Sequence, residues 1–489
     1  MDNFQKKSAL LVLLSIVILS SCKRDRGTPE FGNFPAPVAK IMMGKCAVPG
    51  CHTGQSKDAN GGLSLVSWND LFNGSTNGAD VIPYRTDFSP LLFFVNTYPD
   101  LGISLKPTMP NNRPALSRDE VETLKNWITQ GAPDENGFVK FSDNPNRRKI
   151  YVSNQGCDVV TVFDEVTGIP MRYISVGISP NIEAPHMIKI SPDGKYWYVV
   201  FTSSNVVQRY NTSDDSFAGQ VSINSGNWNT ITFTHDSKYA FVVDWSANGQ
   251  IAYLDLSSMS VISTWTGSQL FEYPHGSAIN KTDDTLYVTG QTGNYIYKIP
   301  INDPTSAEQV SLQPGKPAVT SPSLDIHEIS FSPDYSKYFV TCQGTNEVRV
   351  IKTSNDSLLK IIPVGIWPQE MSFSKTSNYM FVSCQEDTLT FPGKRGSIAV
   401  IDYNSNTLFK TVFSGFQPHG LTVDDTKNLV YVANRNVTSK GPAPHHTGYC
   451  GGRNGYVTFI DMTTMTLVTD LYNDKRTELS VDPYSVAIR

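Results

Sequence analysis

The sequence predicts a small all-α domain followed by an all-β propeller of seven blades. A strand pattern recurs every 42 to 52 residues from residue 185 onward, and matching half-patterns stand at the two ends of the repeating region. Before that region, apolar residues near position 120 have helical spacing. The length of 489 residues also exceeds what one hydrophobic core usually serves, so at least two domains are expected.

Composition and charge narrow the class of protein. Hydrophobic residues make up 39% of the chain and charged residues 17%, with 35 Gly and 30 Pro, which excludes a disordered chain and a coiled coil. The 40 basic and 45 acidic residues give a net charge of −5, and no run of basic residues is present. We therefore expect no nucleic acid partner.

The first 21 residues have the order of an export signal. Two lysines precede an apolar run from Ala9 to Leu19, which is too short to span a bilayer. The run ends in Leu-Ser-Ser-Cys, which resembles the lipobox of bacterial lipoproteins and implies cleavage before Cys22 and acylation of its thiol. An ordinary secretory peptide is the alternative. We expect an exported, membrane-anchored protein, on the periplasmic face or the outer membrane, with residues 22–35 as a flexible tether.

Residues 46–52, Cys-Ala-Val-Pro-Gly-Cys-His, bring two thiols and an imidazole together. Covalent attachment of haem c needs this set, because two cysteines form thioethers to the porphyrin and the adjacent histidine ligates the iron. Four residues separate Cys46 from Cys51, where two are usual, so this loop must fold back on itself. Pro49-Gly50 suits such a turn. We expect His52 to be the first axial ligand.

A methionine loop and a helix follow this motif. Met109 lies between prolines at 107 and 110, and we expect it to be the second axial ligand, with core filling as the alternative. Ser117 and Glu120 form a capping box that predicts the start of a helix. This order resembles single-haem class I cytochrome c domains over residues 36–132.

Two other interpretations of the cysteine motif are a structural disulfide between Cys46 and Cys51 and a zinc site. The disulfide leaves His52 and the Met109 loop without a role. The zinc site needs a fourth ligand, and the next histidine along the chain is His186, well outside this region.

Residues 148–489, after a linker at 133–147, consist of short strands rich in Val, Ile, Tyr and Phe. The region opens with a second strand (149–154) that has no first strand before it, and it ends with a first strand (483–488) that has nothing after it. Joining the two completes a seventh blade and removes free sheet edges. Segments such as Tyr-Val-Ser-Asn at 151–154 resemble the YVTN-type family of seven-bladed propellers. A pair of sandwiches is the alternative, but it would not explain the matching ends.

Aligning the blades places one polar or aromatic residue per blade in the same column, where the innermost strand begins near the mouth of the central channel. The column contains His186, Asn229, His275, His327, Gln369, His419 and Tyr484. An insertion at 435–454 carries His445, His446 and Cys450 toward the same face, and another lengthens residues 385–396. These histidines predict a possible site for copper or another transition metal, with Cys450 as a soft ligand. The alternative is that the column residues hydrogen-bond the loops. Cys157 stands alone, and Cys342 and Cys384 are expected to be small buried thiols.

The predicted function is electron transfer by an exported haem c protein that is anchored by lipid on Cys22. The propeller would be a platform for a redox partner protein, or would carry a metal or substrate site at the channel mouth. Two alternatives remain: a propeller metalloenzyme, an oxidoreductase that uses the haem as an electron relay, and a non-enzymatic surface binding module.

Overall fold

The structure is a computed structural model that describes residues 31–489 apart from 267–270, 322, 438–449, 451–454 and 469–476. The predicted signal peptide, Cys22, His445 and His446 lie outside the described residues. Within the described part of the chain, no helix is both long and apolar enough to cross a membrane.

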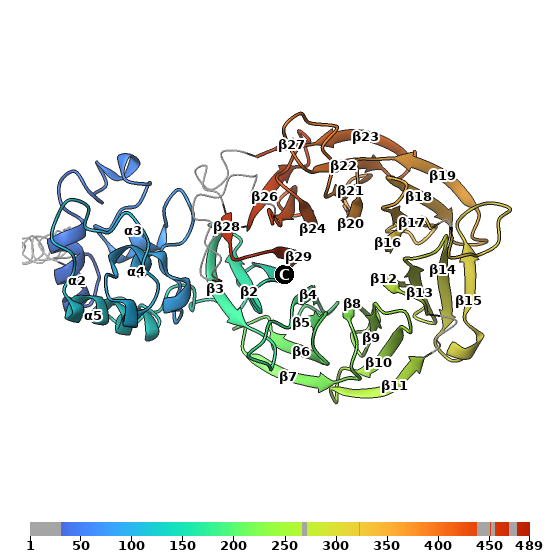
Figure 1. The fold of residues 1–489 in the computed structure, drawn as a ribbon, viewed down its shortest axis with the longest axis horizontal. Coiled ribbons are helices and arrows are strands. Elements are labelled where there is room, and N and C mark those ends of the chain that lie inside the picture. Colours follow the sequence, from blue (N-terminus) through green and yellow to red (C-terminus); the bar gives the residue numbers. More distant parts are fainter. Residues whose placement is uncertain (1–30, 267–270, 322, 438–449, 451–454, 469–476) are drawn as a thin grey trace, which may run out of the picture.

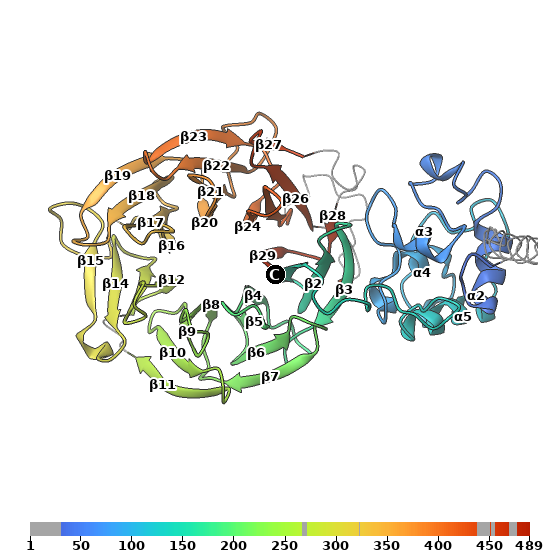
Figure 2. The ribbon, with the colours of Figure 1, turned by 180° about the vertical axis from the view of Figure 1, so that it is seen from behind.

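Seven β-sheets surround a common centre, which confirms the seven-bladed β-propeller (Figures 1 and 2). Six of the sheets use consecutive strands, with the first strand innermost. The first three of these sheets contain β4 (Pro185–Ile190), β5 (Tyr196–Phe201), β6 (Val206–Asn211) and β7 (Phe217–Ser222); β8 (Trp228–Phe233), β9 (Tyr239–Asp244), β10 (Gln250–Asp255) and β11 (Ser260–Thr266); and β12 (Pro274–Ile279), β13 (Thr285–Gly290), β14 (Tyr295–Pro300) and β15 (Glu308–Ser311).

The next three sheets repeat this order. They contain β16 (Ile326–Phe331), β17 (Lys337–Cys342), β18 (Glu347–Lys352) and β19 (Leu358–Pro363); β20 (Pro368–Phe373), β21 (Tyr379–Cys384), β22 (Ser397–Asp402) and β23 (Thr407–Val412); and β24 (Pro418–Asp424), β25 (Leu429–Asn434), β26 (Gly455–Asp461) and β27 (Thr466–Leu467). In the last of them, β28 (Thr477–Leu479) also pairs with β26. A short 3-10 helix, η5 (Pro304–Ser306), precedes β15.

The seventh blade is built from both ends of the propeller region. Its strand order is β29 (Pro483–Ile488), β1 (Lys149–Asn154), β2 (Val159–Asp164) and β3 (Ile169–Ser175). The inner strand β29 pairs antiparallel with β1, with Ile488 opposite Ile150 and Val486 opposite Val152. The ring is thereby closed by backbone hydrogen bonds, as the matching half-patterns predicted.

The apolar strands form because each blade is covered on both faces by its neighbours. Strands β9 and β17 are buried at every residue except the first. Trp197 and Trp228 are fully buried, and Trp197 stacks on Tyr210 with ring centroids 4.0 Å apart. The outermost strand β23 is exposed along most of its length, so its pattern is more polar. This two-faced burial explains why the second strands are rich in consecutive β-branched and aromatic residues.

The segment before the propeller, residues 31–147, is helical and irregular. Its elements are α2 (Ala36–Ile41), the π-helical turn η1 (Met42–Cys46), η2 (Lys57–Ala59), α3 (Trp68–Phe72), η3 (Thr86–Phe88), α4 (Pro90–Val95), η4 (Pro99–Leu101) and α5 (Arg118–Thr129). Helix α5 begins at the predicted capping box, where the Ser117 side chain accepts from the Glu120 backbone and the Glu120 carboxylate accepts from the Ser117 backbone. Its buried residues Val121, Leu124, Trp127 and Ile128 pack toward α2 and α4.

This N-terminal segment lies beside the blade that closes the ring, next to its outer strand β3 (Figure 1). Phe88 stacks on Tyr173 of β3, with ring centroids 4.3 Å apart and planes inclined by 18°. The Arg85 guanidinium donates to the Tyr173 carbonyl over 2.7 Å and to the Ser175 hydroxyl. Apolar burial and charge-assisted hydrogen bonds therefore hold the two parts together.

Candidate functional site

The loop between the two cysteines folds back as the sequence required. The Cys51 amide donates to the Val48 carbonyl over 2.9 Å, and Gly50 has φ +83°, which is the geometry of a tight turn with Pro49 and Gly50 at its corner. The His52 amide then donates to the Cys46 carbonyl over 3.2 Å. The four intervening residues are absorbed by this turn, and His52 is brought back beside the first cysteine.

The His52 ring is oriented by a backbone carbonyl. Its Nδ1 lies 3.2 Å from the Leu63 carbonyl oxygen, which can only accept, so Nδ1 carries the proton and Nε2 keeps its lone pair. Fixing the tautomer in this way is how proteins prepare an imidazole for a metal.

His52 faces a cavity of about 500 Å³ that is also lined by Cys46 and Met109. The Met109 loop is fixed by its backbone amide, which donates to the carbonyl of Phe94 in the last turn of α4 over 2.7 Å. Apolar residues supply most of the other walls, among them Met42, Leu63, Leu65, Leu91, Phe94, Val95 and Leu124. Three of the four residues predicted to hold a haem thus share one apolar cavity; Cys51, the fourth, is partly buried at the end of the turn.

The structure favours neither alternative interpretation of this motif. Cys46 and Cys51 are both free thiols, so no disulfide joins them. Burial raises the pKa of Cys46 to about 11. Among the described residues, the group of potential metal ligands that comes together does not include Cys46, Cys51 or His52. A preformed zinc site is therefore not found here.

The seven column residues of the propeller meet around its centre. Successive ring pairs have centroid separations of 6.2 Å for His186 and His275, 4.0 Å for His275 and His327, and 5.7 Å for His327 and His419. Tyr484 lies 3.6 Å from His419 and 4.1 Å from His186, which closes the circle. All of them except His419 line a cavity of about 640 Å³ at this end of the centre.

A second ring of residues lines the same cavity and was missed in the sequence. Each of these residues directly follows the second strand of its blade; they are Gln155, Thr202, Trp245, Gln291, Gln343, Gln385 and Arg435. The blade alignment contained the signal, since this position is as regular as the histidine column. The guanidinium carbon of Arg435 lies 4.8 Å from the centroid of the Tyr484 ring, and Arg435 also forms an ion pair with Asp482. The contact with Tyr484 connects this second set of residues to the column residues.

In four blades, a hydroxyl residue that follows Tyr-Val or Phe-Val in the second strand ties its blade to the next. Ser153, Thr289, Thr341 and Ser383 occupy the same place in their second strands, and each donates to the carbonyl of a column residue in the following blade. The distances are 3.1, 3.1, 2.9 and 2.6 Å. The recurring hydroxyl therefore satisfies a buried carbonyl and fixes the backbone of four of the column residues.

The column histidines are buried and neutral. Burial lowers the pKa of His275 to about 4. Burial, together with unfavourable interaction with neighbouring imidazoles and, for His186 and His419, with Arg435, holds the pKa values of His186, His327 and His419 well below the usual 6.5. The Nδ1 atoms of His275 and His419 each lie 3.2 Å from a backbone carbonyl oxygen, so they donate and leave Nε2 as the acceptor. His419 Nε2 has no hydrogen-bond partner.

The expectation that Cys450 is a soft metal ligand is wrong, and so is the view of Cys157 as solitary. These two residues form a disulfide, with Cα atoms 5.4 Å apart. A sulfur held in this bond has no thiolate to offer a metal. Cys342 and Cys384 are buried free thiols, as expected.

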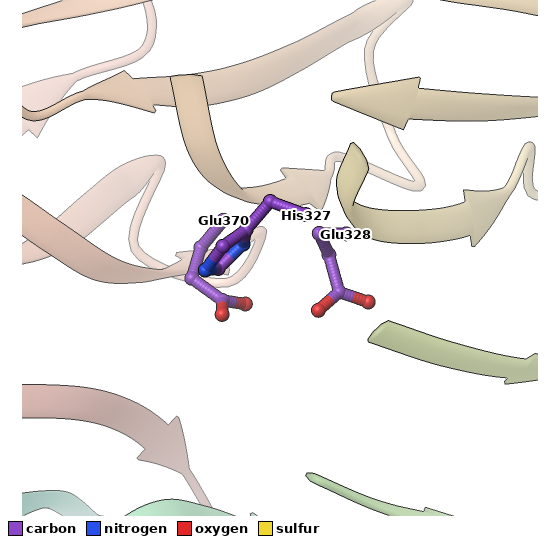
Figure 3. A group of neighbouring side chains, drawn as sticks. All are labelled: His327, Glu328 and Glu370. Carbon is purple, nitrogen blue, oxygen red and sulfur yellow. The ribbon is translucent and has the colours of Figure 1, made fainter. Parts of the chain in front are cut away.

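Two carboxylates beside the ring were also missed. Glu328 and Glu370 directly follow His327 and Gln369, and their carboxylate oxygens lie within 4.8 Å of each other and of a His327 nitrogen. Figure 3 shows both carboxylates projecting from neighbouring inner strands on the same side as the His327 ring. Burial raises the pKa of Glu370 to about 7, and burial together with repulsion from Glu370 raises the pKa of Glu328 well above its usual value.

Comparison with known proteins adds little to this geometry. No protein-family model and no curated protein match the chain. Among solved structures, hydrazine synthase of Kuenenia stuttgartiensis is similar at 15% identity and a TM-score of 0.46, covering 64% of this chain and 91% of that one. A functionally unknown protein from Desulfotomaculum acetoxidans DSM 771 is similar at 14% identity and a TM-score of 0.48, covering 68% of this chain and 99% of that one.

Proposed function

We propose that residues 36–132 form a cytochrome c-like domain that carries one covalently attached haem c, and that the chain is an electron-transfer protein whose propeller is a docking platform. The observation that carries this proposal is the shared cavity, because Met109 is distant in sequence from the motif of Cys46 and His52, yet all three line one apolar space of about 500 Å³. A haem needs an apolar slot with a ligand on each face.

The residues present fit this group. The thiols of Cys46 and Cys51 are unpaired and would form the thioether links, while His52 Nε2 and the Met109 thioether would hold the iron. When bound, the haem supplies one-electron oxidation and reduction. The Leu63 carbonyl keeps the His52 ring in place, and the apolar walls exclude water.

Export and lipid attachment at Cys22 belong to the same proposal. The disulfide between Cys157 and Cys450 supports it, since such bonds persist mainly outside the cytoplasm. A lipid on Cys22 would hold the haem and the propeller near a membrane, where a redox partner protein can meet them. Labelling cells with a radioactive fatty acid tests this part: the wild-type chain should be labelled and Cys22→Ala should not.

The test of the haem proposal is expression of the full chain in a host that attaches haem c, followed by a denaturing gel stained for haem. We expect a stained band for the wild type and for Cys342→Ala, which removes a buried propeller thiol. Cys46→Ser combined with Cys51→Ser should lose the stain. Met109→Ala should keep the stain but change the visible spectrum, because only an iron ligand is removed. A folded but colourless wild-type protein would refute the proposal.

A further inference from the structure

We propose that the centre of the propeller binds one divalent first-row transition-metal ion between His327, Glu328 and Glu370. This site is separate from the haem cavity, and its failure would leave the haem proposal untouched. It also differs from a site made of the histidine column alone, because two of its three ligands are carboxylates.

The distances suit a single ion. One ligand atom from each of the three side chains lies within 4.8 Å of the other two. Zinc binds nitrogen and oxygen ligands at about 2.0–2.2 Å, so two ligands of one ion lie roughly 3 to 4.4 Å apart. Small rotations of the two carboxylates (Figure 3) would bring all three atoms to bonding distance.

The backbone explains how two consecutive residues reach the same space. Neighbouring side chains normally point to opposite faces of a strand. In β16, however, His327 and Glu328 together lie opposite Thr341 alone, because the pairing register shifts between Ile326 and Ile329. This β-bulge turns both side chains toward the centre, a common use of bulges at functional sites.

The same bulge ties the two contributing strands together. The Thr341 hydroxyl accepts from the Glu328 amide over 2.9 Å and donates to the Gln369 carbonyl over 2.9 Å. One hydroxyl therefore fixes the backbone on which Glu328 sits and the residue directly before Glu370. The site is built on rigid strands rather than on loops, so the backbone that carries the ligands is held in place before any ion arrives.

Unpartnered polar atoms point to a missing ligand. His327 is 3% exposed and Glu328 is 6% exposed, yet His327 Nδ1 and Glu328 Oε2 have no hydrogen-bond partner. Buried polar atoms are nearly always paired, and two neighbouring carboxylates repel each other unless a cation lies between them. Within the described chain, no Lys or Arg nitrogen forms an ion pair with Glu328 or Glu370, although Lys189 is near enough to attract both.

The ligand set selects the kind of ion. One imidazole and two carboxylates suit Zn²⁺ or Mn²⁺, whereas Cu⁺ prefers thiolates and thioethers, and Cys450 is held in a disulfide. Three protein ligands leave a coordination position open. His327 lines the cavity of about 640 Å³, and both glutamates line a second cavity of about 410 Å³ toward the other end, so a small anion or water could reach the ion.

The test is calorimetric titration of the chelator-treated full chain with ZnCl₂ and, separately, MnCl₂, with metal content measured after dialysis. We expect one ion per chain for at least one metal, beyond any haem iron. Glu370→Gln and Glu328→Gln should weaken binding roughly a hundredfold, and Thr341→Val should weaken it roughly tenfold because it only positions the ligands. Glu347→Gln is the matched control, since it makes the same change in the same blade at a carboxylate already paired with Arg349; binding should be unchanged.

Thermal unfolding provides a second measurement that does not depend on calorimetry. Zn²⁺ or Mn²⁺ should raise the unfolding temperature of the wild type but not of Glu370→Gln, because an ion that binds only the folded state stabilises it. Without metal, Glu370→Gln should unfold at a temperature no lower than that of the wild type, since the substitution removes repulsion between the two carboxylates.

Absence of binding by both metals, or equal binding by the wild type and Glu370→Gln, would overturn the proposal. Loss of binding in His186→Gln alone would assign the ion to the histidine ring instead and would equally overturn it.

Discussion

Removing the disulfide between Cys157 and Cys450 should weaken the propeller strongly. Cys157 lies in the turn between β1 and β2, and Cys450 lies in the long connection between β25 and β26, so the bond ties the closing blade to its neighbour. The perturbation is the double variant Cys157→Ala with Cys450→Ala. It leaves the hydrogen bonds between β29 and β1 in place and removes the covalent link alone.

The expected magnitude follows from the length of chain that the bond closes. The two cysteines are 293 residues apart. The chain-entropy model gives a loss of about 5 to 6 kcal/mol at 25 °C for a loop of this length, while native disulfides usually contribute about 2–5 kcal/mol when removed. With a urea m-value of roughly 3 kcal/mol/M, this lowers the unfolding midpoint by about 0.7 to 1.7 M.

The assay is urea unfolding followed by tryptophan fluorescence, with thiol titration of the denatured chain as its control. Because both cysteines are oxidised, the wild type and the double variant should show the same number of reactive thiols. Two fewer thiols in the variant would mean that the bond does not form. An unchanged urea midpoint would refute the argument that this link stabilises the ring.

Three further predictions concern other parts of the chain. Asp215→Asn should lower the free energy of unfolding by roughly 3–5 kcal/mol in urea unfolding, because Lys149, only 2% exposed and 2.8 Å from Asp215, would lose its charged partner; a loss under 1 kcal/mol would contradict this. Gly50→Ala should reduce the haem stain per chain, because φ +83° costs alanine about 1–2 kcal/mol; equal staining would count against the turn. Burial alone would raise the pKa of Glu120, but hydrogen bonds from Lys45 and Ser117 outweigh it and hold the pKa below its usual value. This carboxylate therefore stabilises the start of α5 above about pH 4.5 and loses that effect as the pH falls through its lowered pKa, so Glu120→Gln should flatten the acid side of the thermal unfolding profile.

Much of the fold could be predicted because its signals are local. The innermost strands begin at Pro185, Trp228, Pro274, Ile326, Pro368, Pro418 and Pro483, where the aligned pattern placed them. A blade repeats one arrangement of strands and turns, so every copy leaves the same trace in the sequence. The capping box is equally local, since two residues three positions apart, Ser117 and Glu120, determine where the helix starts.

The candidate sites could be predicted only in part. Residue types and spacing grouped Cys46, Cys51, His52 and Met109, but the orientation of the His52 ring depends on the carbonyl of Leu63, which no spacing rule identifies. The histidine column was visible because it repeats. Glu328 and Glu370 were not, since consecutive residues in a strand are expected on opposite faces. Only the bulges opposite Thr341 and Ser383 bring them to the centre.

Sequence alone therefore determined the propeller strands, their order, the start of α5 and the closure of the ring, because each depends on neighbours within a few residues or on the matching ends. Tertiary structure alone decided which distant groups meet. Cys157 forms a disulfide with Cys450 across a sequence separation of 293 residues, and Phe88 stacks on Tyr173 at the junction of the two parts. Such contacts depend on how whole blades pack and on the path of the chain between them. The sequence around each of these residues therefore does not identify its partner.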